Sequence, residues 1–513
     1  MKQSSRAKEF WSMFLLVAGI VIGAGIYLKN KELLAQTGNP IIATALWGVV
    51  GLVCIMSVVV FVEISKSTLK SGNGTIGNWS KLFLNRRIAS FFAIVYTFVY
   101  MPTTQSVFVA GVVGYMIQAI GIELSPVEIL SIYLTCCISI LALFVITNIY
   151  SPRHSKNLQL FGGVFKFIPL IVAMIAGFIL WGMGTSNSFN DPAMAENIKA
   201  LSFLGGFGAI LFSFDGYVYI ANMQRGAKHP EQVSKALTAG MVFVTIFYIL
   251  IALATFGGGN GTIEGVLSKI FGGGKEAENV AWIIANIIMM LVCLLSVNMF
   301  TNLGMTEIFS DYNCKIIYIP KSKASIKSAA LLQFVLTIIY FIATILLGTL
   351  APHGEWQGVN ANVGHFNGDL PLYLDQAAYF INSFSSATTV MVFIMLDMLI
   401  FGAMINRFTR KVDVPKVKLF WPAAIVSSLM IMVFNIFGIV AFLIPDKGFT
   451  FVESNGFIFL LILIFCIFYA TIIFIAQEIF FAKKDPFNGF EGVVDENLLT
   501  NNWVEANNEQ IKI

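Results

Sequence analysis

Three glycines fall within seven residues of the first long hydrophobic run, in the segment VAGIVIGAGIY from Val17 to Tyr27. A glycine inside a helix costs about 1 kcal/mol relative to alanine, so Gly19, Gly23 and Gly25 together predict an interrupted helix. Lipid cannot satisfy the backbone groups that an opened helix exposes, and such a break is tolerated only within protein or beside a water-filled cavity. The alternative is that Gly19-x-x-x-Gly23 serves close packing between two helices.

A second interruption is predicted from Phe212 to Gly216, in the sixth hydrophobic run. Interrupted helices at corresponding places in two halves of a chain are typical of the substrate site of a transporter. N–H groups freed at the start of a half-helix attract an anion, and carbonyls freed at the end of the other half-helix accept from an ammonium group. The two breaks therefore favour a zwitterion such as an amino acid. Gly23, Ala24 and Gly25 are small enough for a carboxylate to approach their amides closely.

The composition is that of an integral membrane protein, with 57% hydrophobic and only 12% charged residues in 513. A soluble chain carries about 25% charged residues. Twelve runs are long enough to cross a hydrocarbon core of about 30 Å. The predicted spans are 9–35, 40–65, 88–121, 126–149, 159–183, 201–222, 235–257, 279–302, 326–350, 376–405, 419–444 and 457–482. The first is too long for a signal peptide, and we expect it to be retained.

Basic residues alternate along the chain as twelve spans require. With the N-terminus inside, the inside segments hold 24 Lys and Arg residues and the outside loops hold six. Positive charge favours the cytoplasmic side, so both termini are predicted to be cytoplasmic in a multi-pass protein of the cell membrane. Lys29, Lys31 and Glu32 are assigned to the first outside loop, with their charges at the membrane interface.

The sequence lacks the signature motifs of several function classes. No Walker A, HExxH, paired Cys-x-x-Cys or Gly-x-Ser-x-Gly motif is present, so neither an ATP-driven pump nor an enzyme is expected. The six cysteines form no disulfide or metal pattern, and we expect no metal and no cofactor. A channel would need repeated polar rings, which do not occur. The basic loops are scattered between spans and do not indicate nucleic-acid binding, and residues 485–513 form an acidic tail.

Ionisable residues inside spans are expensive, and each is a functional candidate. Lys166 lies in the fifth run, where it either exchanges protons or extends to the membrane surface. Asp215 lies at the second break, where it either contacts substrate or caps the broken helix. Asp397, in the tenth run, either takes part in proton coupling or pairs with a polar neighbour. Glu63, at the cytoplasmic end of the second run, is expected to be structural.

Aromatic residues flank the second break. Phe212 and Phe214 are placed to close over a ligand, and Phe212 is the predicted gate; core packing is the alternative for both. We also expect Gly25→Val to abolish binding, because it blocks the approach of substrate to the backbone. The predicted substrate-binding residues are Val21, Gly23, Ala24, Gly25, Ile26, Phe212, Ser213, Asp215 and Gly216, with Lys166 and Asp397 as proton-coupling candidates.

Four segments resemble the amino acid–polyamine–organocation transporter superfamily. VIGAGIY is similar to the glycine signature of that family's first helix, and FVEISKSTLKSGNGTIGNW to its second-helix pattern, although Asn73 replaces a glycine and Leu69 a proline. GVFKFIPLIV is similar to the fifth-helix Lys…Pro-Leu segment. LFSFDGYVYIANMQRGAKHPEQVSKAL resembles the sixth helix and its loop, but residues 222–225 depart from the usual acidic pair and only the proline at 230 is kept.

The resemblance implies an all-α membrane fold with twelve transmembrane helices. It has a 5+5 inverted repeat (LeuT-like) with helices 1 and 6 broken, plus two peripheral helices. The expected divisions are 1–184 for helices 1–5, 185–418 for helices 6–10, 419–484 for helices 11–12 and 485–513 for the tail. In such a fold the substrate carboxylate meets amides at Gly23 to Gly25, and its ammonium meets carbonyls near Val21, Phe212 and Asp215. Lys166 occupies a position that replaces sodium in some members.

The implied function is secondary transport of amino acids by alternating access, either as proton symport or as amino acid exchange. A carboxylate at Asp215 is not typical of members that carry neutral side chains, so a polyamine or organic-cation carrier is an alternative. A sensor of the same fold that binds amino acids without moving them is another. The expected partners are a small amino acid, the lipid bilayer and, in symport, protons.

Overall fold

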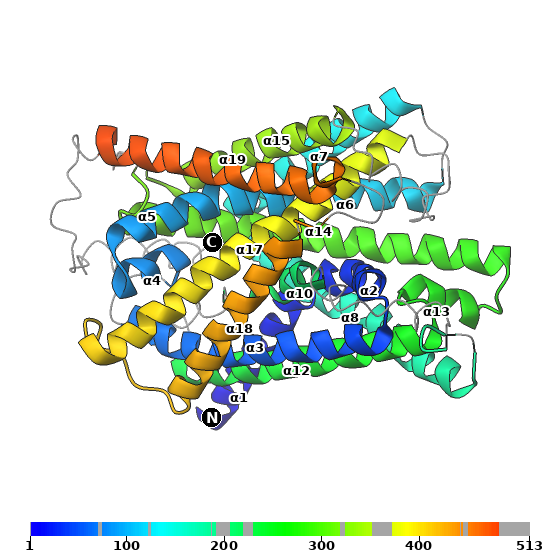
Figure 1. Ribbon diagram of the computed structural model, residues 1–513, viewed down its shortest axis with the longest axis horizontal. Helices are drawn as coiled ribbons and strands as arrows, with labels where there is room; N and C mark the ends of the chain where they lie inside the picture. The colour runs from blue at the N-terminus through cyan, green and yellow to red at the C-terminus, as the bar shows by residue number, and fades with distance from the viewer. Residues whose placement is uncertain are drawn as a thin grey trace.

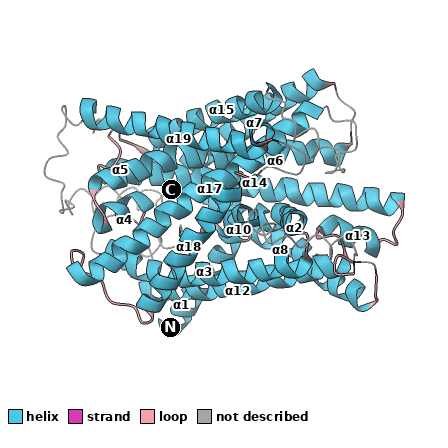
Figure 2. Ribbon diagram, in the orientation of Figure 1, coloured by secondary structure: helices cyan, strands magenta, loops and turns pink. Residues whose placement is uncertain are grey.

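The computed structural model describes residues 2–69, 74–121, 125–185, 187–190, 206–218, 229–318, 324–350, 372–441, 443–444 and 450–481. Within these ranges every regular element is a helix and no strand occurs (Figure 2). The expectation of an all-α protein is confirmed there. The tail at 485–513, the histidines at 353 and 365, the glycine and asparagine at 72 and 73, and residues 222–228 of the loop pattern lie outside the described residues.

The first half of the described chain runs through α1 (Lys2–Val21), α2 (Ala24–Thr37), α3 (Pro40–Ser65), η1 (Lys66–Leu69), α4 (Ile76–Phe83), α5 (Arg86–Val95), η2 (Tyr96–Tyr100), α6 (Met101–Ile120), α7 (Pro126–Tyr150) and α8 (Pro152–Gly182). The second half runs through α10 (Gly206–Phe214), α12 (Pro230–Gly258), α13 (Ile263–Ile270), α14 (Lys275–Asn313), α15 (Ile326–Leu350), α17 (Leu372–Thr409), α18 (Phe420–Ala441), η5 (Phe451–Glu453), α19 (Asn455–Ala476) and η6 (Gln477–Phe481).

Ten helices in the described residues are long and apolar enough to cross a membrane. They are Pro40–Ser65, Arg86–Ile120, Val127–Tyr150, Pro152–Gly182, Glu231–Gly258, Lys275–Asn313, Ile326–Leu346, Thr388–Thr409, Phe420–Val440 and Leu460–Ile479. The first and sixth predicted spans are not among them. Both are occupied by interrupted helices, α1 with α2 and α10.

Local signals explain where several helices begin and end. The Asn39 side chain accepts from the amides of Ile41 and Ile42, and Pro40 opens α3 at the position where its missing N–H is not needed. Gly38 ends α2 with φ of 62°, a left-handed conformation that favours glycine. Residues 302–311, which follow the eighth predicted span, are a direct continuation of α14. The predicted loop at 66–87 instead contains the helix α4.

The long helices lie roughly along one direction, with α12 beside α3 and α14 beside α6 (Figure 1). Small residues allow the closest of these approaches. A Cβ at Gly51 of α3 would lie 2.3 Å from Thr245 of α12, and one at Gly177 of α8 would lie 2.3 Å from the Ala254 carbonyl oxygen of α12. Helices in membranes associate through such small-residue contacts, because lipid offers no hydrophobic driving force between them.

Two buried carboxylates tie α14 to the segment before α4. Glu307 and Asp311 are one helical turn apart in α14 and are almost fully buried. Glu307 Oε1 accepts from the Ile76 amide at 3.3 Å, and Asp311 Oδ1 accepts from the Thr75 hydroxyl at 3.4 Å. Lys81 of α4 donates to the Cys314 carbonyl just beyond α14. This end of the bundle is therefore linked by polar contacts across distant parts of the chain.

A bidentate ion pair joins the ends of α3 and α17. Arg407 donates through Nε to Glu63 Oε1 at 2.7 Å and through Nη2 to Oε2 at 2.5 Å. Glu63 also accepts from the Val417 amide at 2.7 Å, and the Arg407 guanidinium lies 4.3 Å from the centre of the Phe420 ring. Glu63 links two helices and the loop that leads to α18, which matches its predicted structural role.

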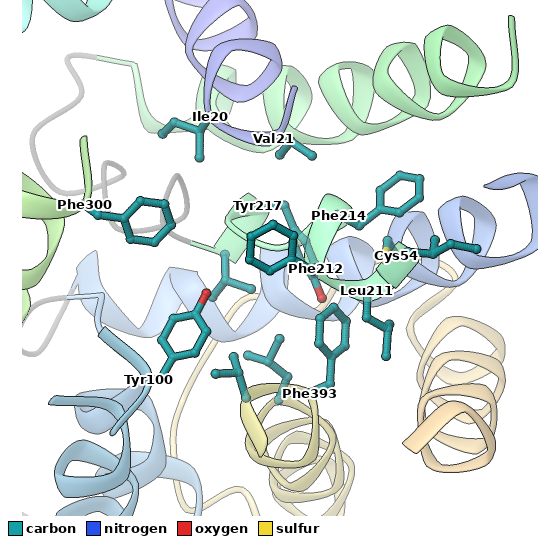
Figure 3. Packing of buried hydrophobic residues seen from close by; sticks show 14 of the residues in the cluster. Ile20, Val21, Cys54, Tyr100, Leu211, Phe212, Phe214, Tyr217, Phe300 and Phe393 are labelled. Atoms are coloured by element: carbon teal, nitrogen blue, oxygen red, sulfur yellow. The ribbon is translucent and has the colours of Figure 1, made fainter. Parts of the chain in front are cut away.

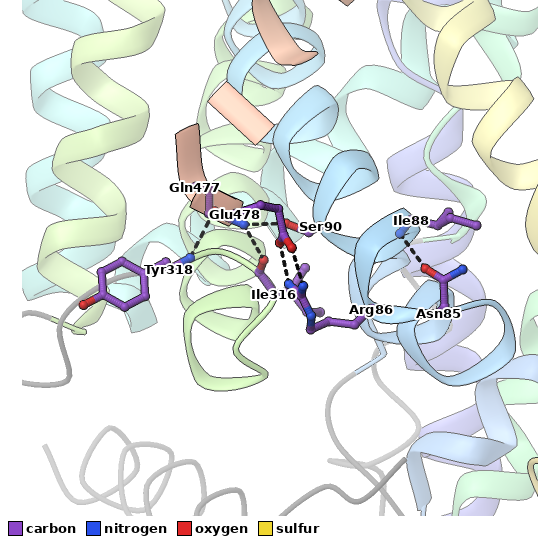
Figure 4. A network of polar contacts seen from close by, with 8 residues as sticks. All are labelled: Asn85, Arg86, Ile88, Ser90, Ile316, Tyr318, Gln477 and Glu478. Carbon is purple, nitrogen blue, oxygen red and sulfur yellow. Dashed lines mark hydrogen bonds and ion pairs between the residues drawn. The ribbon is translucent and has the colours of Figure 1, made fainter. Parts of the chain in front are cut away.

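The last described turn is fastened in a similar way (Figure 4). Arg86 at the start of α5 forms a bidentate pair with Glu478 of η6, with N–O distances of 2.6 and 2.5 Å. The neighbouring Gln477 donates to the Ser90 hydroxyl and to the Ile316 carbonyl oxygen. α19 and η6 are thus attached to α5 by paired charges as well as by apolar contact.

The Glu63–Arg407 pair provides a test of this packing. Glu63→Gln leaves the guanidinium without its counter-charge, and breaking a buried pair costs about 3 kcal/mol or more. We expect a clear fall in the midpoint of thermal unfolding in detergent. Glu231→Gln is the matched control, because its contact with Arg6 is 3.7 Å long and half-exposed. Equal midpoints for the two variants would show that the Glu63 pair does not support the fold.

Candidate functional site

The first predicted break is present between α1 and α2. α1 ends at Val21 and α2 begins at Ala24, with Ile22 and Gly23 outside both helices. The Gly23 amide turns back to the Val21 carbonyl oxygen at 2.8 Å, which interrupts the i to i−4 ladder. Gly23 has φ of −115°, a value open to any residue, so its conformation alone does not require glycine.

The second break follows α10, which ends at Phe214. Asp215 and Gly216 form a turn in which Gly216 has φ of 101°, a conformation that L side chains rarely adopt. Asp215 Oδ1 accepts from the Gly216 amide at 2.8 Å. The other carboxylate oxygen, Oδ2, is buried without a hydrogen-bond partner among the described residues. Asp215 therefore caps the broken helix with one oxygen and keeps the other available.

The two breaks are in direct contact. A Cβ on Gly25 of α2 would lie 2.6 Å from the Ser213 Cα of α10, so only glycine permits this approach. The Tyr248 hydroxyl of α12 lies 2.8 Å from the Val21 carbonyl oxygen and 3.0 Å from the Ser213 carbonyl oxygen. One buried hydroxyl thus bonds the carbonyls at the ends of both half-helices, and it holds the breaks together.

A cluster of three buried rings surrounds this contact. Trp47 of α3 lies 5.0 Å from the Tyr248 ring and 6.0 Å from the Phe214 ring, and Phe214 lies 5.1 Å from Tyr248. All three side chains are fully buried. Phe214 therefore packs in the core, which matches the alternative given for it rather than a role in closing over a ligand.

Phe212 has a different environment, on the side of α10 that faces α6 and α2. Its ring centre lies 6.1 Å from that of Phe108 in α6, and Phe108 in turn stacks on Phe300 of α14 at 5.2 Å. Figure 3 shows the Phe212 ring between Val21 and Phe393, with Phe300 and Tyr100 both to its left in the view. This arrangement is compatible with the predicted gate, because the ring lies where three helices approach the break.

The sequence predicted that Lys29 lies in an outside loop, but the structure places it in a helix. Lys29, Lys31 and Glu32 all belong to α2, and the Lys29 side chain is fully buried. Its ammonium lies 2.8 Å from Glu32 Oε2 and 5.7 Å from the centre of the Phe212 ring. A buried charge needs a partner, and here a carboxylate and an aromatic face provide one. The expectation was wrong because the extended α2 helix packs Lys29 inward, against α10.

Lys166 of α8 is directed at the first break. It is buried, and its ammonium donates to the Gly19 carbonyl oxygen in the last turn of α1. The Tyr27 hydroxyl of α2 donates to the Lys166 carbonyl oxygen at 2.7 Å, so one residue of α8 contacts both half-helices. Extension of Lys166 to the membrane surface does not match this contact. A Cβ on Gly19 would meet no atom within 4 Å, which also disfavours the close-packing role of Gly19.

Asp397 lies at another interface. Its side chain is buried in α17, a helix that packs against α18. One of its carboxylate oxygens has no hydrogen-bond partner in the described residues. Both roles predicted for Asp397, proton coupling and pairing with a polar neighbour, therefore stay predictions.

The backbone of the first break leaves a defined set of donors. The Gly23 amide donates to the Val21 carbonyl oxygen. Because α2 begins at Ala24, the amides of Ala24, Gly25 and Ile26 have no acceptor carbonyl within their own helix. The Val21 carbonyl oxygen already accepts from Gly23 and Tyr248, so it is less suited to an ammonium group than the sequence suggested. The buried Asp215 Oδ2 is the stronger acceptor.

The arrangement can therefore hold opposite charges side by side. The N-terminus of α2 carries partial positive charge toward an anion, and Asp215 carries negative charge toward a cation. No group of three or more His, Cys, Asp or Glu residues that could hold a metal occurs in the described part of the chain. Two joined helix breaks that can bind a zwitterion are the central feature of the site.

Comparison with known proteins identifies the family. A family model described as amino acid permease matches residues 9–469. The chain belongs to the amino acid permease family. It is thus a multi-pass membrane protein of a transporter family, in agreement with its ten apolar helices.

Individual relatives are distant. An uncharacterized protein of Mycoplasma pneumoniae is 24% identical over 489 residues, covering 84% of each chain. The serine/threonine exchanger SteT of Bacillus subtilis is 27% identical and the human cystine/glutamate transporter is 22% identical. These two matches cover 48% and 47% of this chain and 54% and 48% of the relatives, so the chain spans about half the length of these two.

Sequence reasoning missed several residues of this permease site. Tyr248 and Trp47 lie in plain apolar spans with no motif, and Phe108 was likewise not singled out. The available signal was a general one, since the hydroxyl of a tyrosine in a buried span needs a partner. Nothing local showed that the partners of Tyr248 would be the carbonyls of two breaks more than thirty residues away.

The glycines of the first break give a sharp test. Gly25 faces Ser213 rather than a ligand, so Gly25→Val would separate α2 from α10 instead of blocking substrate. Even Gly25→Ala should lower thermal stability, because overpacking costs about 1–3 kcal/mol. Among the described residues, a Cβ on Gly23 would meet only the carbonyl oxygens of Ile20 and Val21, at 3.7 and 3.9 Å, so Gly23→Val should fold normally. The added valine side chain would, however, lie beside the first-turn amides of α2. Gly23→Val should therefore strongly reduce the thermal stabilisation that a ligand provides.

Gly19→Ala serves as the control, because it adds a methyl group to open space within the same helix. It should retain both stability and ligand response. Normal ligand response in Gly23→Val would remove the amides of Ala24 to Ile26 from the binding site.

Proposed function

We propose that this permease carries amino acids across the cell membrane by alternating access. The observation that supports the proposal most directly is the contact between the two helix breaks through Tyr248. The first-turn amides of α2 lie on one side, and on the other lies an Asp215 oxygen that has no hydrogen-bond partner among the described residues. Such breaks are stable in a bilayer only when protein surrounds them, and they bind ligands near its midplane.

The proposed architecture has twelve transmembrane helices, with the broken α1–α2 and α10 added to the ten continuous ones. Helices 1–5 (1–184) and helices 6–10 (185–418) form two inverted repeats, followed by helices 11–12 (419–484) and a tail (485–513). The breaks then fall in the first helix of each repeat. Both termini are proposed to be cytoplasmic, on the basis of the charge distribution in the loops.

In the proposed complex the substrate carboxylate accepts from the amides of Ala24, Gly25 and Ile26. Its ammonium donates to Asp215 Oδ2, and Phe212 closes over it from the side of Lys29. The opposite charges of a zwitterion are then each paired within a low-dielectric interior, which offsets the cost of removing them from water. Ser213 and Gly216 complete the wall through their backbone.

Transport is proposed to be either proton symport or exchange of one amino acid for another. Exchange is supported by the similarity to the Bacillus subtilis relative, which is a serine/threonine exchanger. The named relatives handle different side chains, and their names do not select a substrate for this chain.

An organic-cation carrier is the alternative that the free Asp215 oxygen favours. That alternative is strongest with Asp215 and Asp397 both facing the substrate. A sensor of the same fold would share the whole site and differ only in the absence of transport. Labelled amines and labelled amino acids therefore both belong in the first assay.

The deciding measurement is uptake by purified protein in liposomes. We expect saturable uptake of labelled amino acids, but not of putrescine or spermidine, because these amines lack a carboxylate for the amides of α2. Each substrate is tested with an inward proton gradient and, separately, in vesicles preloaded with unlabelled amino acid. Accumulation with the gradient assigns symport, and uptake confined to preloaded vesicles assigns exchange. Binding without any uptake would contradict the proposal and favour a sensor.

Of the two coupling candidates, Lys166 is hydrogen-bonded to the last turn of α1 at the first break, whereas Asp397 lies in α17, outside both breaks. We therefore expect Lys166→Ala to remove gradient-driven accumulation and the pH dependence of uptake. Asp397→Asn, which keeps the shape of its side chain, should preserve both. The measurement is initial uptake rate across external pH, normalised to the amount of folded protein in the vesicles. The reverse pattern would move coupling to the α17–α18 interface.

A further inference from the structure

The loop between α17 and α18 concentrates basic residues at one end of the bundle. Residues 410–418 contain one acidic and four basic side chains, and the basic ones are Arg410, Lys411, Lys416 and Lys418. All four are exposed. Both neighbouring helices are long and apolar enough to cross a membrane, so the loop that joins them lies at a membrane surface. In Figure 1 it is the gold turn at the lower left, before α18.

Side chains from two helices fix the conformation of this loop. The Asn406 side chain donates to the Val412 carbonyl oxygen at 2.9 Å and accepts from the Val412 amide at 2.7 Å. Five residues later, the Val417 amide donates to Glu63 at 2.7 Å and the Val417 carbonyl oxygen accepts from Arg407 at 3.1 Å. Both backbone polar groups of Val412 and of Val417 are therefore bonded to side chains of α17 or α3.

The fixed backbone separates apolar from basic side chains. Val412, Val414 and Val417 are partly buried against the hydrophobic core, whereas the basic residues next to them are exposed. Arg410 and Leu419, near the two ends of the loop, have φ of 53° and 61°. L side chains rarely adopt such values, and this conformation persists only where surrounding contacts hold it. The contacts of the loop thus keep the valines inward and the basic side chains outward.

Neighbouring protein does not neutralise the charge of the loop. Arg86 and Arg407 are each paired with a carboxylate. No ion pair is seen for the four basic residues of the loop within the part of the chain that the structure describes. Lys411 donates to the Leu84 carbonyl oxygen at 3.0 Å, which places the loop beside the start of α5. Arg87, in the first turn of α5, is also exposed and adds a positive charge close by.

Exposed apolar side chains border the basic residues. Phe408, in the last turn of α17, is 77% exposed, and Leu419, just before α18, is 74% exposed. Exposed apolar residues continue along the two helices at Ile405 and Ile425. Aromatic residues are enriched at the level of lipid headgroups, and basic side chains near helix ends extend to the same level. A surface for acyl chains therefore adjoins a surface for anionic headgroups.

We propose that this surface is a binding site for anionic phospholipids. Its basic residues are Arg87, Arg410, Lys411, Lys416 and Lys418. Exposed Lys and Arg residues at a membrane surface attract anionic headgroups, and each raises the affinity about fivefold. The general excess of basic residues on one side of a membrane depends on their number alone. The contacts that fix this loop are not needed for that purpose, and they support recognition of a ligand.

Lipid is favoured over the other anionic candidate, which is the acidic segment 485–513 of the chain itself. Phe408 and Leu419 extend the basic surface toward the region that acyl chains occupy, and a lipid contacts both parts at once. The proposal does not rest on the proposed transport function, and its test requires no transport.

The experiment measures thermal unfolding of the full-length protein in detergent with added phosphatidylglycerol or phosphatidylcholine of the same acyl chains. Because a ligand of the folded state raises stability, we expect phosphatidylglycerol to raise the midpoint at a lower concentration than phosphatidylcholine. The variant Arg410→Gln/Lys416→Gln/Lys418→Gln should need on the order of a hundredfold more phosphatidylglycerol for the same shift, from about fivefold per charge. Its response to phosphatidylcholine should not change. Lys411 is kept, since it also bonds to Leu84.

The matched control, Lys8→Gln/Arg153→Gln/Lys235→Gln, removes three exposed charges from other segments predicted to lie on the same side of the membrane. It should retain the preference for phosphatidylglycerol. A second readout is the lipid that remains bound after repurification from an equimolar mixture of the two lipids. Wild type and control should be enriched in phosphatidylglycerol, and the loop variant should not be.

Three results would overturn the proposal. A preference for phosphatidylglycerol that is unchanged in the loop variant would remove the site. A preference lost equally in the control would show a response to overall charge. A loop variant that is less stable than wild type before lipid is added, in a protein that shows no preference between the two lipids, would assign the surface to an acidic segment of the chain such as 485–513.

Discussion

The site depends on one constraint, which is that two helices are opened inside a bilayer and their backbone groups must find partners in the protein. The Tyr248 hydroxyl meets part of this requirement for both breaks at once, through the carbonyl oxygens of Val21 and Ser213. Lys166 meets another part at Gly19. These contacts satisfy carbonyls and leave amides, so the site presents donors at α2 and keeps Asp215 as its principal acceptor. The carbonyl oxygens of the breaks already accept hydrogen bonds within the protein, whereas the amides at the start of α2 do not. This difference sets which side of the site attracts an anion and which attracts a cation.

The glycines of the first break have separate purposes that the sequence could not distinguish. Clustering of Gly19, Gly23 and Gly25 was enough to predict the interruption, because the cost of glycine in a helix is a local property. Whether a missing side chain admits a neighbouring helix or a ligand depends on what packs against it. Gly25 admits α10, whereas a Cβ on Gly23 would meet only the end of α1 among the described residues. The second break was predicted from Phe212 to Gly216, and the end of α10 at Phe214 with the positive φ of Gly216 confirms its position.

Contacts across the fold were beyond the reach of sequence reasoning. From the sequence, Lys29 was predicted to be a charge at the membrane interface. Its burial depends on the Phe212 ring, more than 180 residues away, and on Glu32, one turn along α2, and the sequence does not show the contact with Phe212. Tyr248 and Trp47 lie in spans whose apolar pattern predicts only a helix. Glu63 was correctly expected to be structural from its place at a span end, but its partner Arg407 lies 344 residues later. Partners of this kind become visible only when the helices are assembled.

The distribution of polar contacts suggests which parts of the molecule move. The ion pairs Glu63–Arg407 and Arg86–Glu478 are bidentate and lie at helix ends away from the breaks. The breaks themselves are held by single hydrogen bonds from Tyr248 and Lys166, each worth about 1–3 kcal/mol. Alternating access requires two states that differ by only a few kcal/mol, and single bonds at the breaks can exchange within that range while bidentate pairs cannot. A ligand that supplies new partners at Asp215 and at the start of α2 would then compensate for a bond lost elsewhere in the site, which links occupancy to the change of state.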